Sequence, residues 1–357
     1  MGSELPQETP ARQAEGPEGP VGPVGAVESV DVVRAAAAAR AGLVHVIEAS
    51  GAFAHDPAWR EAFAEVPRHL FVPYYFVGTE DGYERLWGED PGPRRRARWL
   101  RGAYADEPLA TRVRDGELIS SSSQPSLMAQ MLAELDVRDG DAVLEIGAGT
   151  GYNAALLAHR LGDELVTTVD LDPEITESAR RHLAAAGRRP TVVTGDGARG
   201  CPERAPYDRI IATCTLETVP PEWLGQCRPG ARILAPMATG LILLDVQDRE
   251  RAEGRFLHTP AYFVPLRGGG RSGERGGERW QPGGGPFTGG LPRRALHSEL
   301  FRFLLELTRD VLDPHEALAL WQREGRPARE RFGVTVSGSD VWAWLDDPTG
   351  PYAWPLP

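Results

Sequence analysis

Residues 142–158 read AVLEIGAGTGYNAALLA, and this stretch decides the fold of the chain. A short apolar run ends at Ile146, glycines follow at 147, 149 and 151, and a helix-forming run begins at once. Glycine lets the backbone turn sharply and approach a ligand without a side chain in the way. The N–H groups at the start of the next helix are then available to a negatively charged group. The stretch therefore predicts a strand, a ligand-binding turn and a helix.

Strands and helices alternate after this loop. Each apolar run has the length of a strand, and a helix opened by Pro173 separates VTTVD (166–170) from TVVTGDG (191–197). Such alternation predicts an α/β fold, a doubly wound parallel sheet with helices on both faces. A helix is also expected upstream, in SSSQPSLMAQMLAEL, with Pro125 in its first turn and a polar cap before it. The expected strands are VTTVD (166–170), TVVTGDG (191–197), DRIIATC (208–214), RILAPM (232–237) and LILLDVQ (241–247).

The N-terminal part of the chain falls into two segments. Residues 1–29 are rich in Pro, Gly and Glu, so we expect a disordered tail. Residues 30–114 should form a helical and loop segment, with loop from Gly78 to Gly102. Within that loop, a basic run is either a solvated surface or a phosphate contact, the former being favoured: Arg94, Arg95, Arg96, Arg98 and Arg101.

The C-terminal part changes composition abruptly. Residues 115–267 form the expected ligand-binding domain, and residues 268–290 are glycine-rich and should be a flexible linker. Residues 291–357 should contain an amphipathic helix (RRALHSELFRFLLELTRDVL) and a tryptophan-rich tail. Because exposed tryptophans at that density are unfavourable, we expect the tail to dock onto the core or a partner, as a peptide-recognition extension.

The composition excludes several classes of function. The chain of 357 residues has a formal net charge of −12 and contains no lysine, which excludes Schiff-base chemistry and the phosphate loop ending in Gly-Lys-Ser/Thr. The acidic balance argues against a nucleic-acid partner. Cys201, Cys214 and Cys227 form no close pair, so neither a disulfide framework nor a metal site is predicted. With no apolar run long enough for a bilayer and no secretory signal, we expect a cytoplasmic protein without a membrane partner.

The spacing of the glycines separates this loop from the dinucleotide fingerprint, whose third glycine would fall at Tyr152. The pattern is instead Glu-x-Gly-x-Gly-x-Gly, and we expect Glu145 to contact the ligand together with Gly147, Gly149 and Gly151. A glycine turn alone also occurs in α/β proteins that bind other ligands, so further residues are needed to identify this one.

Two carboxylates follow at the ends of neighbouring strands. Asp170 ends the second expected strand, where a carboxylate can accept hydrogen bonds from both hydroxyls of a ribose. Asp196 ends the third, where it can reach the amino group of an adenine. We expect Gly197 and Thr213 to line the same crevice, at the carboxyl edge of the sheet.

The glycine loop is one of six motifs: VPRHLFVP (66–73), SSSQP (121–125), VLEIGAGTGYNAALLA (143–158), GDGARG (195–200), APYDRIIAT (205–213) and FVPL (263–266). In order and spacing they resemble the protein-L-isoaspartate O-methyltransferases, which typically read VPR-x-x-FVP, TISQP, VLEIGTGSGYQAA, GDG-x-x-G, APFD-x-I and FVPL. The resemblance covers roughly Val66 to Leu266. It implies the Rossmann-like fold of the class I methyltransferases, S-adenosylmethionine as cofactor, and an aspartyl-type carboxylate in a peptide or protein as methyl acceptor.

The resemblance also assigns an acceptor-side residue. In that family the serine of TISQP lies beside the transferred methyl group and contacts the acceptor carboxylate. Ser123 matches it, and Ser122 precedes it as a substrate-binding candidate. The family's Gly-Gln-Thr-Ile-Ser-Gln-Pro is replaced by Ile-Ser-Ser-Ser-Ser-Gln-Pro (119–125), so the loop that shapes the acceptor pocket differs. Ser123 or Gln124 would also suit a helix N-cap without any part in catalysis.

Methylation of a carboxylate needs no catalytic base, because the reference pKa of a carboxyl group is about 4. The contribution of the protein should be alignment of the two reactants. We therefore expect no catalytic His or Cys. His69 is either a substrate contact or, as we favour, a packed structural residue; Arg68 is a candidate for attracting the acceptor carboxylate, and Cys214 should be a buried strand residue.

The extensions at both ends suggest a dedicated substrate. Repair members of the family end near the FVPL motif, whereas this chain continues for about ninety residues beyond Leu266. It is similar in this to divergent members associated with ribosomally synthesised peptides (graspetides, lanthipeptides and lasso peptides), which methylate an aspartate whose ester cyclises to a succinimide, or aspartimide. We favour that tailoring role over general isoaspartyl repair. A cofactor-binding protein that mainly recruits a partner, and methylation of RNA or a small molecule, are the less favoured alternatives.

Overall fold

The computed structural model describes residues 30–54, 56–79, 82–114, 117–268 and 290–357. The expected disordered tail and nearly all of the expected glycine-rich linker lie outside these residues. In the described part, no helix combines the length and the apolar character needed to cross a membrane.

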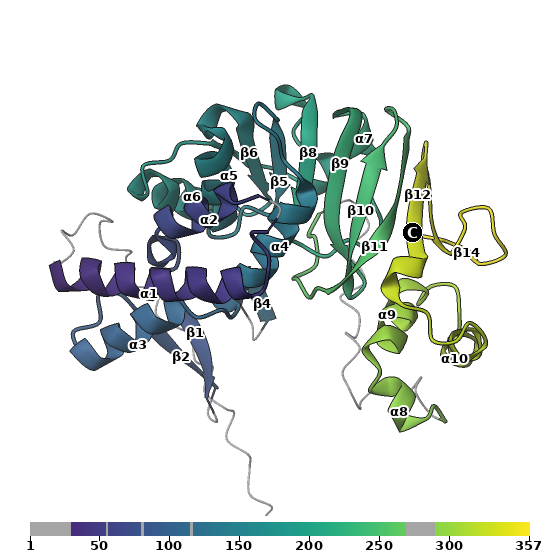
Figure 1. Cartoon of the computed structure of the whole chain (residues 1–357), viewed down its shortest axis with the longest axis horizontal. Coiled ribbons are helices and arrows are strands. Elements are labelled where there is room, and N and C mark those ends of the chain that lie inside the picture. Colours follow the sequence, from purple (N-terminus) through teal and green to yellow (C-terminus); the bar gives the residue numbers. More distant parts are fainter. Residues whose placement is uncertain (1–29, 55, 80–81, 115–116, 269–289) are drawn as a thin grey trace, which may run out of the picture.

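The predicted parallel sheet is confirmed. Its strands stand in the order β9-β8-β5-β6-β7 and form one half of a ten-stranded sheet, seen edge to edge across Figure 1. Strands β5, β6 and β8 are short and buried along nearly their whole length, as expected when helices cover both faces, whereas β7 at the edge is only partly buried. The strands are β5 (Val143–Ile146), β6 (Val166–Asp170), β7 (Thr191–Thr194), β8 (Tyr207–Ala212) and β9 (Cys227–Met237).

Two apolar cores cover the two faces of this sheet, because successive side chains of a strand point in opposite directions. Val143 belongs to the core that contains α1, α2, α4 and α5, whereas Leu144 belongs to the core that contains α7 and the C-terminal helices. The doubly wound prediction therefore holds. The helices around the parallel strands are α1 (Val30–Ala49), α2 (Ala58–Glu65), α4 (Pro125–Leu135), α5 (Tyr152–Leu161), α6 (Pro173–Ala185) and α7 (Pro221–Leu224), with 3-10 turns η2 (Asp163–Leu165), η3 (Gly197–Arg199) and η4 (Pro202–Arg204).

The other half of the large sheet is antiparallel and continues directly from β9. Its last strands come from the tryptophan-rich tail, whose Trp344 and Trp354 are buried. The expectation that the tail docks is thus confirmed, and it docks by adding strands to the sheet. The strands are β10 (Gly240–Val246), β11 (Arg251–Pro260), β12 (Phe332–Ser337), β13 (Asp340–Leu345) and β14 (Ala353–Pro355).

The prediction of a single amphipathic helix in the C-terminal part is wrong. The segment forms two helices, because the Ser298 side chain accepts a hydrogen bond from the Phe301 N–H and starts a new helix there. A third helix, which the sequence reading missed, begins at the capping box of Asp313 and Glu316. These elements are α8 (Arg293–Leu296), α9 (Glu299–Leu307), α10 (Pro314–Arg323) and the turn η5 (Arg329–Arg331).

The prediction of a loop from Gly78 to Gly102 is also wrong. This region completes β1, forms β2, and continues into α3, whose arginines occupy the solvent side while Trp99 and Leu100 are buried. The arginines occupy the exposed side of an amphipathic helix, which was not recognised from the sequence. Together with two later strands, β1 and β2 form a separate antiparallel sheet in the order β2-β1-β3-β4. The elements are η1 (Arg68–Leu70), β1 (Tyr74–Thr79), β2 (Gly82–Trp87), α3 (Pro93–Ala103), β3 (Leu109–Arg114) and β4 (Glu117–Ser122).

Candidate functional site

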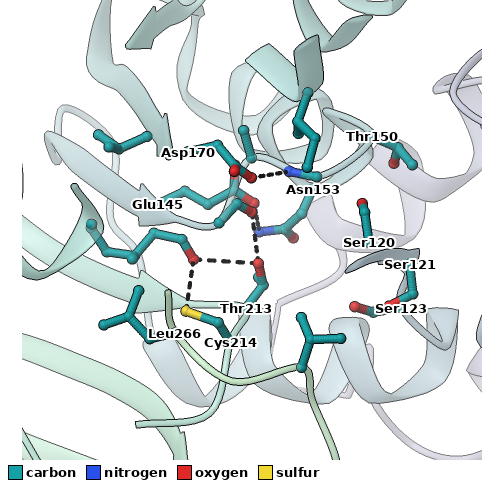
Figure 2. Close-up of a pocket in the computed structure, with 18 of the residues that line it drawn as sticks. Ser120, Ser121, Ser123, Glu145, Thr150, Asn153, Asp170, Thr213, Cys214 and Leu266 are labelled. Atoms are coloured by element: carbon teal, nitrogen blue, oxygen red, sulfur yellow. Dashed lines mark hydrogen bonds between the residues drawn. The ribbon is translucent and has the colours of Figure 1, made fainter. Parts of the chain in front are cut away.

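A pocket with about 800 Å³ of open space lies at the carboxyl edge of the parallel strands. The glycine loop between β5 and α5 forms one wall, and Ser120–Ser123 at the end of β4 form the opposite wall (Figure 2). Residues 264–267, which follow the large sheet's β11, close a third side. The pocket thus joins the two sheets of the protein.

The glycine loop has the conformation that the sequence predicts. Gly147, Gly149 and Gly151 have φ values of 96°, 51° and 84°, a region that other residues rarely adopt. A Cβ on Gly147 would lie 2.8 Å from Thr213 Oγ1, and Gly149 lies close to Ser121. Gly151 does not line the pocket; a Cβ there would meet α6 at 3.3–3.4 Å. The first two glycines therefore shape the pocket, and the third allows α5 and α6 to approach each other.

Glu145 lies at the base of the pocket and is almost fully buried. Its two carboxylate oxygens accept hydrogen bonds from Asn153 Nδ2 at 2.8 Å and from Thr168 Oγ1 at 2.6 Å. Burial raises the pKa of the Glu145 carboxyl to about 7, although both hydrogen bonds act in the opposite direction. Asn153 Oδ1, in contrast, is buried without a hydrogen-bond partner. Figure 2 shows Asn153 between Glu145 and the cavity, so this oxygen is available to a donor group of a ligand.

Asp170 ends β6 as predicted and borders the pocket. Its Oδ2 accepts a hydrogen bond from the Gly149 N–H at 3.1 Å, and its Oδ1 lies 3.6 Å from the guanidinium of Arg267. Burial raises the pKa of Asp170, while the hydrogen bonds from the backbone and the charge of Arg267 oppose the rise. The carboxylate is therefore fixed beside the glycine loop, at a position where ribose hydroxyls can donate to it.

Only some of the residues expected at the adenine end of the site line the pocket. Gly197 and Thr213 line the pocket, and a Cβ on Gly197 would lie 2.7 Å from Ile146. Asp196 does not line it; its carboxylate accepts a hydrogen bond from the Ala198 N–H at 3.0 Å and starts η3. The structure thus brings five of the predicted cofactor residues besides Glu145 to the pocket wall, and it leaves Gly151 and Asp196 behind that wall.

Ser122 and Ser123 both line the pocket. They do not follow the helix-cap alternative: Gln124 is the N-cap residue of α4, and its side chain makes no capping hydrogen bond. Asp106 supplies the bond instead, through Oδ1, which accepts from the Ser126 N–H at 2.8 Å. The N-cap residue is thus Gln124, one of the two expected positions, but its side chain does not supply the capping hydrogen bond. Ser122 Oγ accepts a hydrogen bond from Arg68 at 3.4 Å, whereas Ser123 borders the cavity.

Arg68 lies outside the pocket lining, in contact with the backbone behind the serine wall. It is fully buried, and its guanidinium donates to the carbonyl oxygens of Ser122 and Ser123 at 3.5 and 3.1 Å. It also donates to the carbonyls of Ala103 and Ala105 at 3.0 Å and of Glu107 at 3.2 Å. Burial lowers the pKa of Arg68 to about 10. The structure therefore does not bring Arg68 to the acceptor carboxylate; it joins the acceptor wall to the segment after α3.

His69 and Cys214 have structural surroundings. His69 is buried and also absent from the pocket lining; its Nδ1 lies 2.7 Å from Tyr104 Oη, and its ring meets Trp99 edge-on. Cys214 is buried as expected, just beyond β8, and its Sγ lies 3.9 Å from the Ile146 carbonyl. Burial raises the pKa of Cys214 to about 12, so the thiol stays protonated at neutral pH.

Sequence reasoning missed several pocket residues. Asn153 could have been found from its place in the first turn of α5, one turn beyond a glycine loop. Ser120, Ser121 and Arg267 give no such signal, because their approach depends on the fold of distant segments. Across the described ranges, no cluster of three or more His, Cys, Asp or Glu side chains could hold a metal ion.

These residues fit the predicted cofactor. Gly147 and Gly149 let a ligand approach the backbone of the loop closely, and Asp170, held by the Gly149 N–H, offers acceptors to a ribose. Apolar side chains of Leu171, Ile175 and Leu266 border the pocket, and Leu266 lies close to Gly197, so a flat apolar ring system can pack there. The buried oxygen of Asn153 supplies an acceptor for an ammonium or hydroxyl group.

The comparisons with known proteins agree with this site. The family model for protein-L-isoaspartate(D-aspartate) O-methyltransferase matches residues 95–270. The chain is 36% identical over 223 residues to a protein-L-isoaspartate O-methyltransferase of Hyperthermus butylicus, covering 58% of this chain and 80% of that protein. It is 33% identical over 230 residues to the enzyme of that name from Pyrococcus horikoshii, covering 63% and 91%.

A solved structure of a protein-L-isoaspartate O-methyltransferase has a similar fold. The TM-score is 0.56 and the identity 23%, and the match covers 88% of this chain and 98% of that one. The residues up to Leu266 make up only three quarters of this chain, so the structural match extends into the C-terminal part. The site geometry and the identity to these relatives lead to one assignment: the chain belongs to the protein-L-isoaspartate(D-aspartate) O-methyltransferase family, whose cofactor is S-adenosylmethionine.

Proposed function

We propose that this protein methylates an L-isoaspartyl carboxylate in peptide or protein substrates. One observation carries the proposal: the serine wall at Ser120–Ser123 faces the glycine loop across a single pocket, with a Cβ position on Gly149 only 3.6 Å from the Ser121 carbonyl. An acceptor held by the serines would therefore meet a cofactor held by the loop. The identity to isoaspartate methyltransferases supports the choice of acceptor.

The residues of the chain bind and align the reactants. When bound, S-adenosylmethionine supplies an electrophilic methyl group. Ser123 is proposed to donate a hydrogen bond to the acceptor carboxylate, with Ser122 beside it, while Glu145, Asp170, Gly147 and the other pocket residues hold the cofactor. One carboxylate oxygen forms the bond to the methyl carbon as the bond from that carbon to sulfur breaks. Since the carboxylate is already ionised, no proton has to be moved, and alignment supplies most of the acceleration.

A matched pair of peptides tests the proposal. The two peptides share one sequence and differ only in an aspartyl or isoaspartyl linkage, and mass spectrometry follows the methyl ester while S-adenosylhomocysteine release is recorded. We expect methylation of the isoaspartyl peptide. Ser123→Ala should lower kcat by about tenfold or more, whereas Ser50→Ala, in the exposed turn just after α1, should leave it unchanged. Cofactor binding without methylation of the isoaspartyl peptide would reject the proposal.

The tailoring role is a second candidate, and the acceptor wall favours it. Four successive serines line the pocket where the related family motif has a single one, which indicates an altered acceptor. The C-terminal part no longer distinguishes the two roles, because a solved isoaspartate methyltransferase matches 88% of the chain. In this second candidate the acceptor is an aspartate of a dedicated precursor peptide, the ester closes to a succinimide, and residues 291–357 contribute to peptide recognition. Methylation of the aspartyl peptide alone, followed by loss of methanol, would select it.

A further inference from the structure

The four-stranded sheet has one covered face and one open face. Helix α3 packs on the covered face, where Tyr75 Oη donates to the Trp99 carbonyl at 3.2 Å and Leu86 is buried. Alternation along the strands places their neighbours on the opposite face. The register pairs Tyr74 with Trp87 across β1 and β2. Figure 1 shows these two strands projecting below the body of the protein, beside α3.

Arginine and aromatic side chains form a stack on this open face. The guanidinium of Arg85 lies 4.4 Å from the ring centroid of Tyr74 and 5.7 Å from that of Trp87. Arg95 approaches Trp87 from the start of α3, at 5.6 Å. Phe76 continues the stack, with its ring 6.0 Å from that of Tyr74. Such stacks hold an arginine in place while leaving its donors free for a partner.

The charge of Arg85 is available to a partner. Arg85 is exposed, and no carboxylate within the part of the chain that the structure covers pairs with it. Arg95, in contrast, is paired with buried Asp90 at 2.8 Å and with Glu84 at 3.4 Å. Residues 82–103 as a whole contain six arginines and three acidic residues, in a chain of net charge −12. Five of these arginines belong to α3 on the covered side, so the positive charge that the open face itself presents is that of Arg85.

A groove connects this face with the methyl-transfer pocket. It has about 330 Å³ of open space, and Tyr74 from the open face borders it together with Arg112 of β3 and Ser178 of α6. Ser120 and Gly149 border both the groove and the pocket. A Cβ on Gly149 would lie 3.9 Å from Ser120 Oγ, so these two residues form the ridge between the pocket and the groove. A peptide segment that crosses this ridge leaves the pocket, enters the groove and reaches Tyr74. Glu174 of α6 pairs with Arg112 at 2.5 Å, so the unpaired charge along the path is that of Arg85.

We propose that the open face around Tyr74, Arg85 and Trp87 is the docking surface for an acidic, extended peptide segment that flanks the acceptor residue. The inference rests on the proposed function, because the pocket supplies the end of the path. Aromatic rings pack against the peptide backbone, and Arg85 pairs with a carboxylate a few residues from the acceptor. Substrates with acidic flanking residues are therefore preferred over neutral ones.

Binding can be measured without turnover. The probe is a fluorescein-labelled peptide of glutamate, serine and glycine with no aspartyl residue, compared with the same peptide carrying glutamine for glutamate. Fluorescence anisotropy with the full chain at low salt should give about tenfold tighter binding of the acidic peptide. Arg85→Glu should remove that difference. Arg94→Glu makes the same charge change on the exposed side of α3 and should keep it.

Each other outcome overturns the proposal. Equal binding of the two peptides, equal loss in the two variants, or no binding at all would each exclude an acidic peptide on this face. Dimerisation in sedimentation velocity that Arg85→Glu abolishes would assign the face to a second copy instead. Failure of the proposed function has a separate signature, since acidic peptides would then bind in the anisotropy assay without any peptide being methylated.

Discussion

Replacing Glu145 by glutamine should stabilise the protein at alkaline pH. In the folded protein the pKa of this carboxyl is raised from 4.5 to about 7, chiefly by burial. Below pH 4.5 the group is protonated in both the folded and the unfolded chain, so folding carries no electrostatic penalty there. Above pH 7 it is charged in both, and the buried charge destabilises the fold. The stability that the protonated group provides is therefore lost as the pH rises through this range.

The size of the effect follows from the pKa. A change from 4.5 to about 7 corresponds to about 3 kcal/mol of unfolding free energy, of which about 2.5 kcal/mol falls between pH 5 and 8. Glutamine has the same shape, and its amide can accept from Asn153 and donate to the Thr168 hydroxyl. The variant thus removes the charge and keeps the packing.

Urea denaturation of both proteins at intervals from pH 5 to 8, without cofactor, measures the effect. The free energy of unfolding of Glu145→Gln minus that of the unaltered protein should increase by about 2.5 kcal/mol across the series. Glu164→Gln, which removes one exposed carboxylate, controls for the change of net charge and should give a constant difference. A constant or decreasing difference for Glu145→Gln would show that the carboxyl is not held protonated by its burial, and the reasoning would fail.

Three further changes test the site and its supports. Gly147→Ala should weaken cofactor binding in calorimetry by about tenfold or more. Gly162→Ala, at a glycine with φ of 95° and no atom within 4 Å of the added Cβ, should lower the stability of the protein only. Equal cofactor affinities of the two variants would contradict the crowding argument. Arg68→Met leaves five buried or partly buried carbonyls without their donor and should lower the free energy of unfolding by about 3–5 kcal/mol in urea denaturation; a loss below about 1 kcal/mol would contradict its proposed support role. Arg329→Met removes a 2.7 Å ion pair between buried Arg329 and partly exposed Glu299 and should speed hydrogen exchange in β12–β14 more than in β5–β8; uniform exchange would contradict local anchoring.

The parallel half of the fold was predictable because its signals are local. The apolar run ending at Ile146, the glycine turn and Pro173 at the start of α6 each describe a few adjacent residues, and the structure places them as expected. Glu145 and Asp170 were found for the same reason, since each ends or lies within a recognisable strand.

The acceptor wall could not be predicted in the same way. Strand β4 reads ELISSS, and its serines look like a helix cap because nothing nearby shows their pairing with β3. The capping hydrogen bond goes to Asp106, which lies twenty residues before Ser126, the residue whose backbone N–H donates it. Arg68 looked like a substrate contact because an arginine beside a binding motif suggests a charge partner. Its five carbonyl acceptors lie 35 to 55 residues further along the chain and become neighbours only in the folded protein.

The reach of Arg68 has a consequence for how this protein can be shortened. The family match begins at residue 95, and every residue that lines the main pocket lies between it and residue 270. A chain trimmed to that interval would keep all the groups expected to touch cofactor and acceptor. It would lack Arg68, whose guanidinium binds the carbonyls of Ser122 and Ser123 from behind the pocket wall. The matched interval therefore contains the residues expected to bind cofactor and acceptor, but not Arg68, which positions Ser122 and Ser123. A shortened protein should accordingly start before residue 68.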